Sequence, residues 1–126
     1  MTVAAILLSC GGGGEKKTGN EDNKGSEQQE KSSDLSANTD YQKGLELVAK
    51  SNCLTCHKVD EALTGPKYRD VANKYAAMPD TIVRHLAGKI IAGGKGVWGE
   101  VYMTPHPELS QEDAEAMVKY ILLLKK

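Results

Sequence analysis

The most informative segment of this 126-residue chain is Cys53-Leu54-Thr55-Cys56-His57. On a helical turn, residues at positions i, i+3 and i+4 share one face, so both sulfurs and the imidazole can point the same way. The C-x-x-C-H spacing is typical of c-type haem attachment, in which the thiols bond to the vinyl groups and the histidine binds the iron. We therefore predict one haem c, held covalently through Cys53 and Cys56, with His57 as an iron ligand.

Three other kinds of site can use cysteine and histidine side chains. A zinc site needs a second pair of ligands, and the only other cysteine of the chain, Cys10, lies far from the motif. A thioredoxin-like redox pair belongs in a βαβ unit, which the hydrophobic pattern does not indicate. A disulfide between Cys53 and Cys56 is geometrically possible but leaves His57 without a role.

Composition restricts the function classes further. The chain has 16 basic and 17 acidic side chains and a formal net charge of −1, so it lacks the basic excess typical of nucleic-acid-binding proteins. It contains no Phe and one Trp, which is little apolar material for a small domain that must build its own core. A bound porphyrin would supply the missing apolar body, and we expect the haem-free chain to be largely unfolded.

The composition also divides the chain into three parts. Residues 1–10 are apolar and end at Cys10, and residues 11–39 are rich in Gly, Ser, Lys and Glu, which predicts a disordered linker. Residues 40–126 form the predicted domain. The segment Leu7-Leu8-Ser9-Cys10-Gly11 resembles the bacterial lipobox, which implies that Cys10 is lipidated after cleavage of a signal remnant. The alternative is an ordinary chain terminus with one unpaired cysteine.

Four helices and no strands are expected in the domain. The first covers residues 41–52, is capped by Thr39 or Asp40, and has an apolar side formed by Tyr41, Leu45, Val48 and Ala49. The second covers residues 68–75. The third follows a cap at Asp80 and ends at Gly93, where the chain can adopt the left-handed conformation that favours helix termination. The fourth begins at a capping box, Ser110-Gln111-Glu112-Asp113, and has an apolar stripe through Met117 to Leu124.

A sixth iron ligand can come from five side chains: Met78, Met103, Met117, His85 and His106. Met117 falls on the apolar stripe of the last helix, where a gap-filling core methionine is expected. Met103 is favoured because residues 99–107 lack helical periodicity and contain two prolines that stiffen the chain. His106 and an open iron site remain as alternatives.

Residues 41–126 resemble a class I c-type cytochrome of the small bacterial monohaem kind. The resemblance rests on the haem motif, on Gly65-Pro66-x-Tyr68-x-Asp70-Val71-Ala72, on Gly96-Val97-Trp98-Gly99 and on Met103 before Pro105. It implies an all-α cytochrome c fold, with about four helices wrapped around one haem, and Tyr120 at the packing of the first and last helices. Two departures are visible: Tyr102-Met103-Thr104-Pro105 replaces the family's Pro-Met-Pro, and Val48 replaces an aromatic residue on the first helix.

The resemblance also implies roles for individual residues. His57 and Met103 would be the axial ligands, and the Pro66 carbonyl would accept a hydrogen bond from the Nδ1–H of His57. Trp98 would contact a haem propionate, and Lys89 falls where relatives often place a basic propionate partner.

The expected activity is single-electron transfer by Fe(II)/Fe(III) exchange, and not catalysis, because both axial positions would be filled by protein. The expected partners are redox proteins, such as a membrane quinol-oxidising complex and a terminal oxidase or reductase. Lys58, Lys67, Lys89 and Lys95 would form a docking ring. We expect a monomer in the periplasm or cell envelope, anchored to a membrane if Cys10 is lipidated. The alternatives are a haem-based gas sensor or peroxidase-like enzyme with an open sixth site, and a fixed haem subunit of a larger complex.

Overall fold

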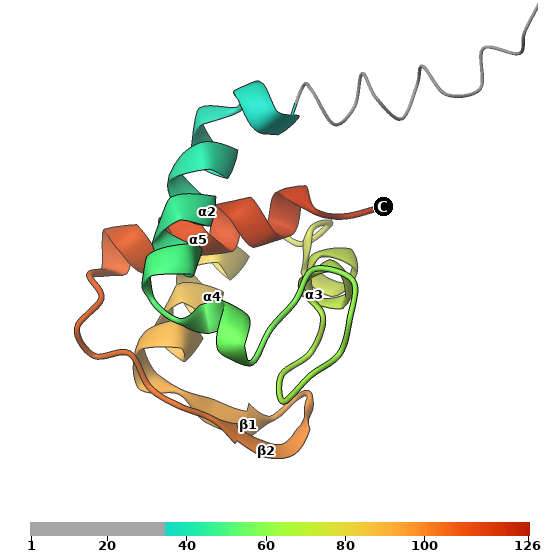
Figure 1. The fold of residues 1–126 in the computed structure, drawn as a ribbon, viewed down its shortest axis with the longest axis vertical. Helices are drawn as coiled ribbons and strands as arrows, with labels where there is room; N and C mark the ends of the chain where they lie inside the picture. Colours follow the sequence, from blue (N-terminus) through green and yellow to red (C-terminus); the bar gives the residue numbers. More distant parts are fainter. Residues whose placement is uncertain (1–34) are drawn as a thin grey trace, which may run out of the picture.

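The computed structural model of the protein describes residues 35–126. The predicted signal remnant, Cys10 and most of the predicted linker lie outside these residues. The elements in chain order are α2 (Thr39–Lys50), a 3-10 turn η1 (Cys53–Thr55), α3 (Tyr68–Tyr75), α4 (Thr81–Ala92), β1 (Gly94–Gly96), β2 (Gly99–Met103) and α5 (Gln111–Leu123). Each of the four predicted helices is present, and α3 has the predicted bounds (Figure 1).

The helix starts follow local capping chemistry. Ser110 caps α5 as predicted, because its hydroxyl accepts a hydrogen bond from the Asp113 N–H at 3.0 Å. The prediction for α2 was wrong by one residue: the cap is Asn38, whose side-chain oxygen accepts from the Tyr41 N–H at 3.1 Å. Asp80 precedes α4 but its side chain makes no capping hydrogen bond, since its backbone is already helical.

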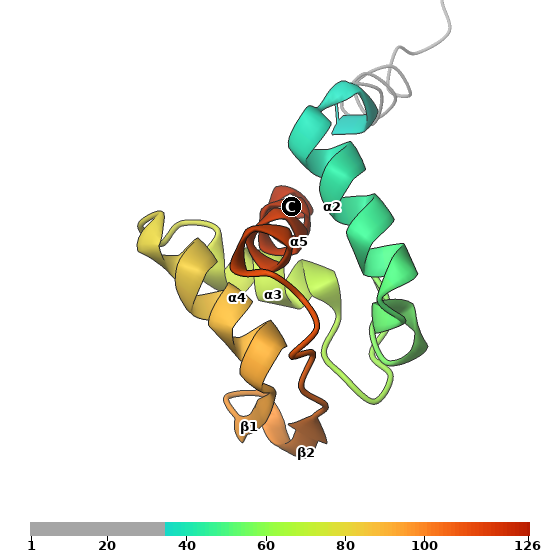
Figure 2. The same ribbon diagram turned by 90° about the vertical axis from the view of Figure 1, so that its left-hand side faces the viewer.

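Helices α2 and α5 cross at close range and form the centre of the fold (Figure 2). Gly44 makes this possible, because a Cβ there would lie 2.3 Å from the Tyr120 Cβ and 2.4 Å from the Ala116 carbonyl oxygen. The rings of Tyr41 and Tyr120 then meet edge to face with centroids 5.1 Å apart. Tyr120 therefore lies at the packing of the first and last helices, as expected from the resemblance.

The buried face of α2 differs from the predicted one. Leu45 and Ala49 were expected on the apolar side, but both are exposed, and the buried positions are Gly44 and Val48. Leu47 packs partly against the same core. The close approach of α5 at Gly44 decides which side of α2 faces inward, and Leu45 lies to one side of that contact.

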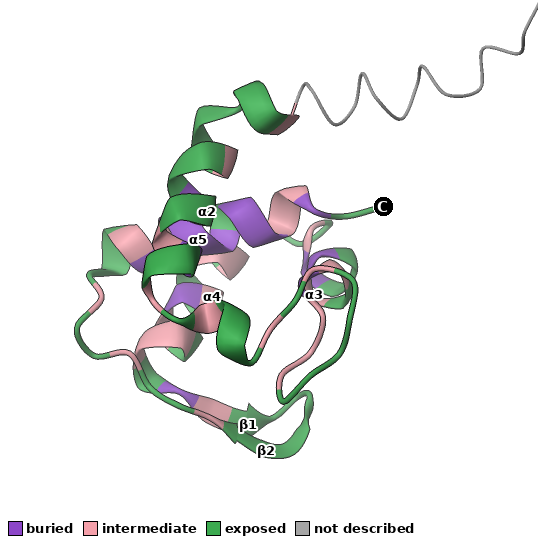
Figure 3. Ribbon diagram, in the orientation of Figure 1, coloured by how far each residue is buried: buried purple, intermediate pink, exposed green. Residues whose placement is uncertain are grey.

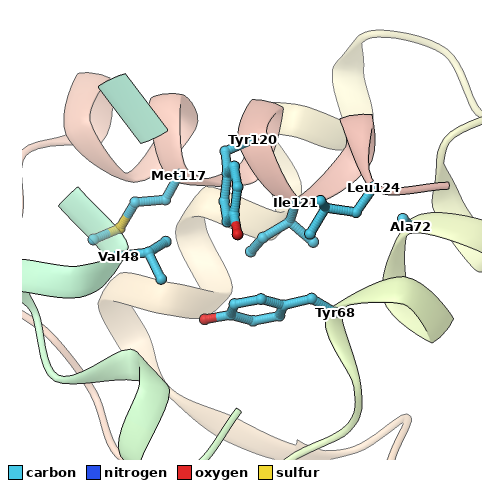
Figure 4. Close-up of a cluster of buried hydrophobic side chains, with 7 residues drawn as sticks. All are labelled: Val48, Tyr68, Ala72, Met117, Tyr120, Ile121 and Leu124. Atoms are coloured by element: carbon cyan, nitrogen blue, oxygen red, sulfur yellow. The ribbon is translucent and has the colours of Figure 1, made fainter. Parts of the chain in front are cut away.

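Two clusters of buried side chains fill the interior. The larger one joins α2, α3 and α5 and consists of Val48, Tyr68, Ala72, Met117, Tyr120, Ile121 and Leu124 (Figure 4). The smaller one joins α4 to α5 and consists of Ala87, Ala114 and Val118. Met117 is fully buried, so it is a core residue, as its position on the apolar stripe indicated.

The expectation of no strands was wrong. Strands β1 and β2 form an antiparallel hairpin in which Gly94 pairs with Met103 and Gly96 with Gly99. The short strands carry no apolar alternation that could have revealed them. Their conformation depends on glycines with positive φ, among them Gly96 at 117° and Gly99 at 109° on either side of the turn. Met103 is thus the last residue of a strand and not part of an irregular loop.

No helix within residues 35–126 combines the length and the hydropathy needed to cross a bilayer.

Candidate functional site

The haem motif occupies a tight turn directly after α2. Asn52 has a left-handed conformation, with φ of 59°, and reverses the chain before the turn. The N–H groups of Cys56 and His57 both donate to the Cys53 carbonyl, at 3.1 Å and 2.9 Å. The motif is therefore wound as a 3-10 turn, and this brings the two thiols and the imidazole together over a single turn.

The imidazole of His57 is fixed by the loop that follows it. Its Nδ1 lies 2.9 Å from the Pro66 carbonyl oxygen, so Nδ1–H is the donor and Nε2 is left to bind a metal. The ring of Tyr68 stacks against it with centroids 4.9 Å apart and an interplanar angle of 16°. Gly65 touches the ring so closely that a Cβ there would lie 2.4 Å from the His57 Cε1. These contacts fix both the tautomer and the orientation of the ring.

Backbone hydrogen bonds close the loop between His57 and α3. Gly65 N–H donates to the Cys56 carbonyl at 2.8 Å, and Tyr68 N–H donates to the Lys58 carbonyl at 2.9 Å. The position of the Pro66 carbonyl is therefore set by the same loop that begins at the haem motif.

Arg69 fastens this loop to the rest of the protein. Its guanidinium donates two hydrogen bonds to the Asp60 carboxylate and one to the Leu124 carbonyl at the end of α5. The hydrogen bonds and charge of Arg69 lower the pKa of Asp60. Sequence reasoning missed this pair, because two residues on either side of a loop carry no local pattern that links them.

The two thiols have different environments. Cys53 is half-buried and Cys56 is exposed, and both are free. Burial raises the pKa of the Cys53 thiol, and burial also raises the pKa of the neighbouring Tyr68 hydroxyl.

Met103 lies where the hairpin returns to the end of α4. Gly93, with φ of 66°, packs so tightly against it that a Cβ would lie 2.4 Å from the Met103 carbonyl oxygen. Three residues later, the N–H of His106 is shared by the carbonyls of Ile90 and Ile91, at 3.2 Å and 3.1 Å. Met103 itself and the segment that follows it are thus held against the C-terminal end of α4.

The other candidate ligands have different surroundings. Met78 and His85 are exposed, and Met117 is in the core. The His106 ring is only partly exposed, and its Nδ1 lies 3.1 Å from a carboxylate oxygen of Glu108.

Trp98 and Lys89 lie near the two ends of the hairpin. Trp98 is at the turn between Gly96 and Gly99, is 45% exposed, and meets the ring of Tyr75 edge to face. Lys89 is exposed in the last turn of α4, and its side chain has no ion pair within residues 35–126.

The other three lysines of the expected docking ring are each paired with a carboxylate. The pairs are Lys58–Glu61 at 3.2 Å, Lys67–Asp70 at 3.8 Å and Lys95–Glu100 at 2.8 Å. The local field at these three lysines is therefore weaker than their number suggests.

Large apolar side chains without protein cover gather on the two segments that carry His57 and Met103. Figures 1 and 2 show both segments at the same end of the molecule, and Figure 3 shows how much of this end is exposed. On these two segments the exposed apolar residues are Leu54 and Leu63 beside the haem motif, and Val97, Trp98, Val101 and Tyr102 on the hairpin. So much uncovered apolar surface is unusual for a small protein and fits a large apolar group bound there.

The donor set also fits a haem. Two thiols on one turn can form thioether bonds, and a fixed imidazole and a thioether are the usual pair of protein ligands to the iron of such a group. Residues 35–126 contain no cluster of three or more His, Cys, Asp or Glu side chains that could hold a metal ion by themselves. The side chains present therefore suit a haem better than the zinc site considered above.

Comparisons with known proteins agree with this site. Residues 41–125 match the family model described as Cytochrome c. Cytochrome c-552 of Nitrosomonas europaea is 43% identical over 84 residues, which cover 67% of this chain and 81% of that protein. Cytochrome c-551 of Pseudomonas denitrificans is 40% identical over 82 residues, which cover 65% of this chain and 98% of that protein.

A crystal structure of Nitrosomonas europaea cytochrome c552 has the same fold. The two structures superimpose with a TM-score of 0.60, and the aligned region covers 64% of this chain and 99% of the Nitrosomonas protein. This similarity confirms the predicted cytochrome c fold, which is mostly helical and in this protein also contains the short β1–β2 hairpin. The chain therefore belongs to the cytochrome c family of small electron carriers, whose members bind one covalently attached haem c.

Proposed function

We propose that this protein carries single electrons with His57 and Met103 as the two axial ligands of its haem iron. Haem c supplies reversible exchange between Fe(III) and Fe(II) when it is bound. The observation that carries the proposal is the His57 ring, whose Nδ1 is engaged by the Pro66 carbonyl at 2.9 Å while Nε2 is left for iron. Met103 supports it from the hairpin at the same end of the molecule (Figure 1).

The protein's own groups would tune the site in a predictable direction. Donation from Nδ1–H to the Pro66 carbonyl increases the basicity of Nε2 and so strengthens His57 as a ligand. A thioether ligand such as Met103 favours the ferrous state and raises the reduction potential relative to two histidines. With both axial positions filled, the protein would leave no iron site for a gas ligand or peroxide.

The remaining expected contacts concern the edge of the haem and its attachment. Cys53 and Cys56 would form the thioether bonds. Trp98 and Lys89 would interact with propionates, for which an indole N–H and an ammonium group are suitable donors.

The proposed partners are other redox proteins of the cell envelope. Bacterial cytochromes c of this kind are typically periplasmic, which favours a membrane quinol-oxidising complex as electron donor and a terminal oxidase or reductase as acceptor. A lipid on Cys10 would keep the protein near that membrane, and a monomer would suit a mobile carrier.

Spectroscopy of the haem protein tests the ligation. We expect the oxidised protein to show a sulfur-to-iron charge-transfer band that is lost in Met103→Ala, and the reduced protein to bind no carbon monoxide. Met78→Ala is the matched control, because Met78 is 47% exposed and should leave the band unchanged. An absent band together with ready carbon monoxide binding would favour the gas-sensor or peroxidase-like alternative.

The dependence of electron transfer on salt tests docking through lysines. We expect the rate with an acidic partner to fall as ionic strength rises, and Lys89→Gln to lower the rate more than Lys95→Gln, because Lys95 is already paired with Glu100. A rate that does not change with salt would remove the docking proposal. Purification as a stoichiometric component of a larger complex would favour a fixed subunit over a mobile carrier.

A further inference from the structure

Three side chains from α3 and the hairpin turn form a compact cluster. The Trp98 indole meets the Tyr75 ring edge to face, with centroids 6.4 Å apart and an interplanar angle of 75°. The ammonium group of Lys74 lies over both rings, 5.6 Å from the centroid of Tyr75 and 5.8 Å from that of Trp98. A cation at these distances is attracted by the faces of both rings.

The cluster contacts the turn of the hairpin, which is the end that α4 does not hold. Strand β2 has its Met103 end tied to α4 through Gly93 and through the shared N–H of His106. At its other end, Trp98 precedes Gly99, and no backbone hydrogen bond joins the hairpin to α3 within residues 35–126. Tyr75 is only 8% exposed, so its ring is held in place by the core and Trp98 packs against a fixed side chain.

Among the described residues, no carboxylate forms an ion pair with Lys74. The ion pairs within residues 35–126 involve other lysines, so its ammonium group is engaged by the two aromatic rings. Its position in the last turn of α3 also suits the negative end of the helix dipole.

We propose that Lys74 is a positioning residue that, through Tyr75 and Trp98, holds the hairpin against α3 and thereby keeps Met103 in place as an iron ligand. The inference rests on the proposed His57/Met103 ligation and adds a residue that the resemblance does not assign. A hairpin that is free at its turn would let β2 pivot about its attachment to α4. Exogenous ligands would then compete with Met103 more easily.

Imidazole binding to the oxidised haem protein tests this, with loss of the charge-transfer band as the readout. We expect Lys74→Met to bind imidazole about two- to fivefold more tightly than the wild type, the factor that corresponds to an exposed cation–π contact. Lys74→Arg should restore wild-type affinity, because a guanidinium group can also lie over both rings. Lys119→Met is the matched control, since Lys119 is exposed on α5.

A double-mutant cycle shows whether Lys74 acts through Trp98. We expect Trp98→Leu to bind imidazole more tightly, and the variant with both changes to match Trp98→Leu alone. A wild-type affinity in Lys74→Met, or an effect of Lys74→Met that persists in full in the Trp98→Leu background, would overturn the proposal. If Trp98→Leu does not fold, the contrast between Lys74→Met and Lys74→Arg decides alone.

The same titration separates this proposal from the ligation on which it rests. If the wild type shows the charge-transfer band and Lys74→Met binds imidazole as the wild type does, only the role of Lys74 is wrong. If the wild type lacks the band and Met103→Ala binds imidazole as the wild type does, Met103 is not a ligand and both proposals fail.

Discussion

The crossing of α2 with α5 and the end of the molecule that carries His57 and Met103 are built in opposite ways. At the crossing, the two helices pack directly against each other. Gly44 allows the close contact, and Val48, Met117 and Tyr120 are almost completely buried. At the other end, Val97, Val101 and Tyr102 expose most of their apolar surface. The side chains of the first region pack against other parts of the protein, whereas the second region exposes apolar side chains and donor residues that suit a bound haem.

The comparison explains how a chain with no Phe and one Trp can form a folded domain. Helix packing at the crossing fixes the arrangement of α2, α3 and α5 and so determines where the haem motif begins. A haem bound at this end would cover the apolar side chains that the hairpin and the loop leave exposed. Stability therefore depends both on the helix crossing and on the haem, and the two sets of contacts meet at Tyr68, which packs in the core and stacks on His57.

The largest effect is expected from removing the covalent haem. The variant with Cys53→Ser and Cys56→Ser should lose haem attachment and most of its helical circular dichroism, because a domain of this size has little core without the cofactor. The haem-loaded wild type is the control. A cofactor-free chain with the full helical signal would show that the α2–α5 crossing is sufficient for folding.

A methyl group at the crossing should have the next largest effect. Gly44→Ala places its Cβ 2.3 Å from the Tyr120 Cβ and against the α5 backbone, so we expect a loss of about 3 kcal/mol in the free energy of unfolding. Gly88→Ala is the control, because Gly88 lies within α4 with open space around it, and should stabilise by about 0.5–1 kcal/mol. Equal effects in denaturant unfolding would contradict the close helix contact.

A methyl group at Gly93 should displace Met103 without disturbing the packing of α2 against α5. Gly93→Ala combines a strained φ of 66° with a clash against the Met103 carbonyl, and we expect loss of the charge-transfer band together with about 2 kcal/mol of stability. Gly94→Ala has a strained φ of 138° but open space, so it should keep the band. If both variants lose the band equally, strain and not contact with Met103 is responsible.

The smallest effect is expected at Asp60. Its pKa is lowered by Arg69, so the pair stabilises the folded protein above the ordinary carboxyl pKa of about 4, and this contribution is lost as the pH falls through the lower folded value. Unfolding of the wild type and Asp60→Asn should therefore differ at pH 6 and converge towards pH 3. Asp80→Asn is the matched control, because it removes an exposed carboxylate that has no ion pair within residues 35–126. A constant difference between wild type and Asp60→Asn would contradict the role of Arg69.

Short-range patterns predicted much of this protein. The bounds of α3, the Ser110 cap of α5 and the buried stripe through Met117 follow from residues within a few positions of one another. The haem motif is also local, since its two thiols and its imidazole occupy one turn. These features depend on hydrogen bonds and side-chain contacts that close over three or four residues, so the sequence contains all the partners they need.

Contacts between distant segments were not predictable in the same way. The buried face of α2 was misjudged at Leu45 because it depends on where α5 approaches Gly44. The hairpin was missed because its strands are held by glycine conformations and by pairing across the turn, and carry no apolar alternation.

The sequence by itself determined that this chain is helical and carries a C-x-x-C-H haem motif. Only the tertiary structure decided that the Tyr68 ring stacks on His57, that Arg69 joins Asp60 to the end of α5, and that Lys74 lies over Trp98. The physical reason is that each of these contacts joins side chains or carbonyls whose distance is set by the packing of whole helices, which no local pattern records.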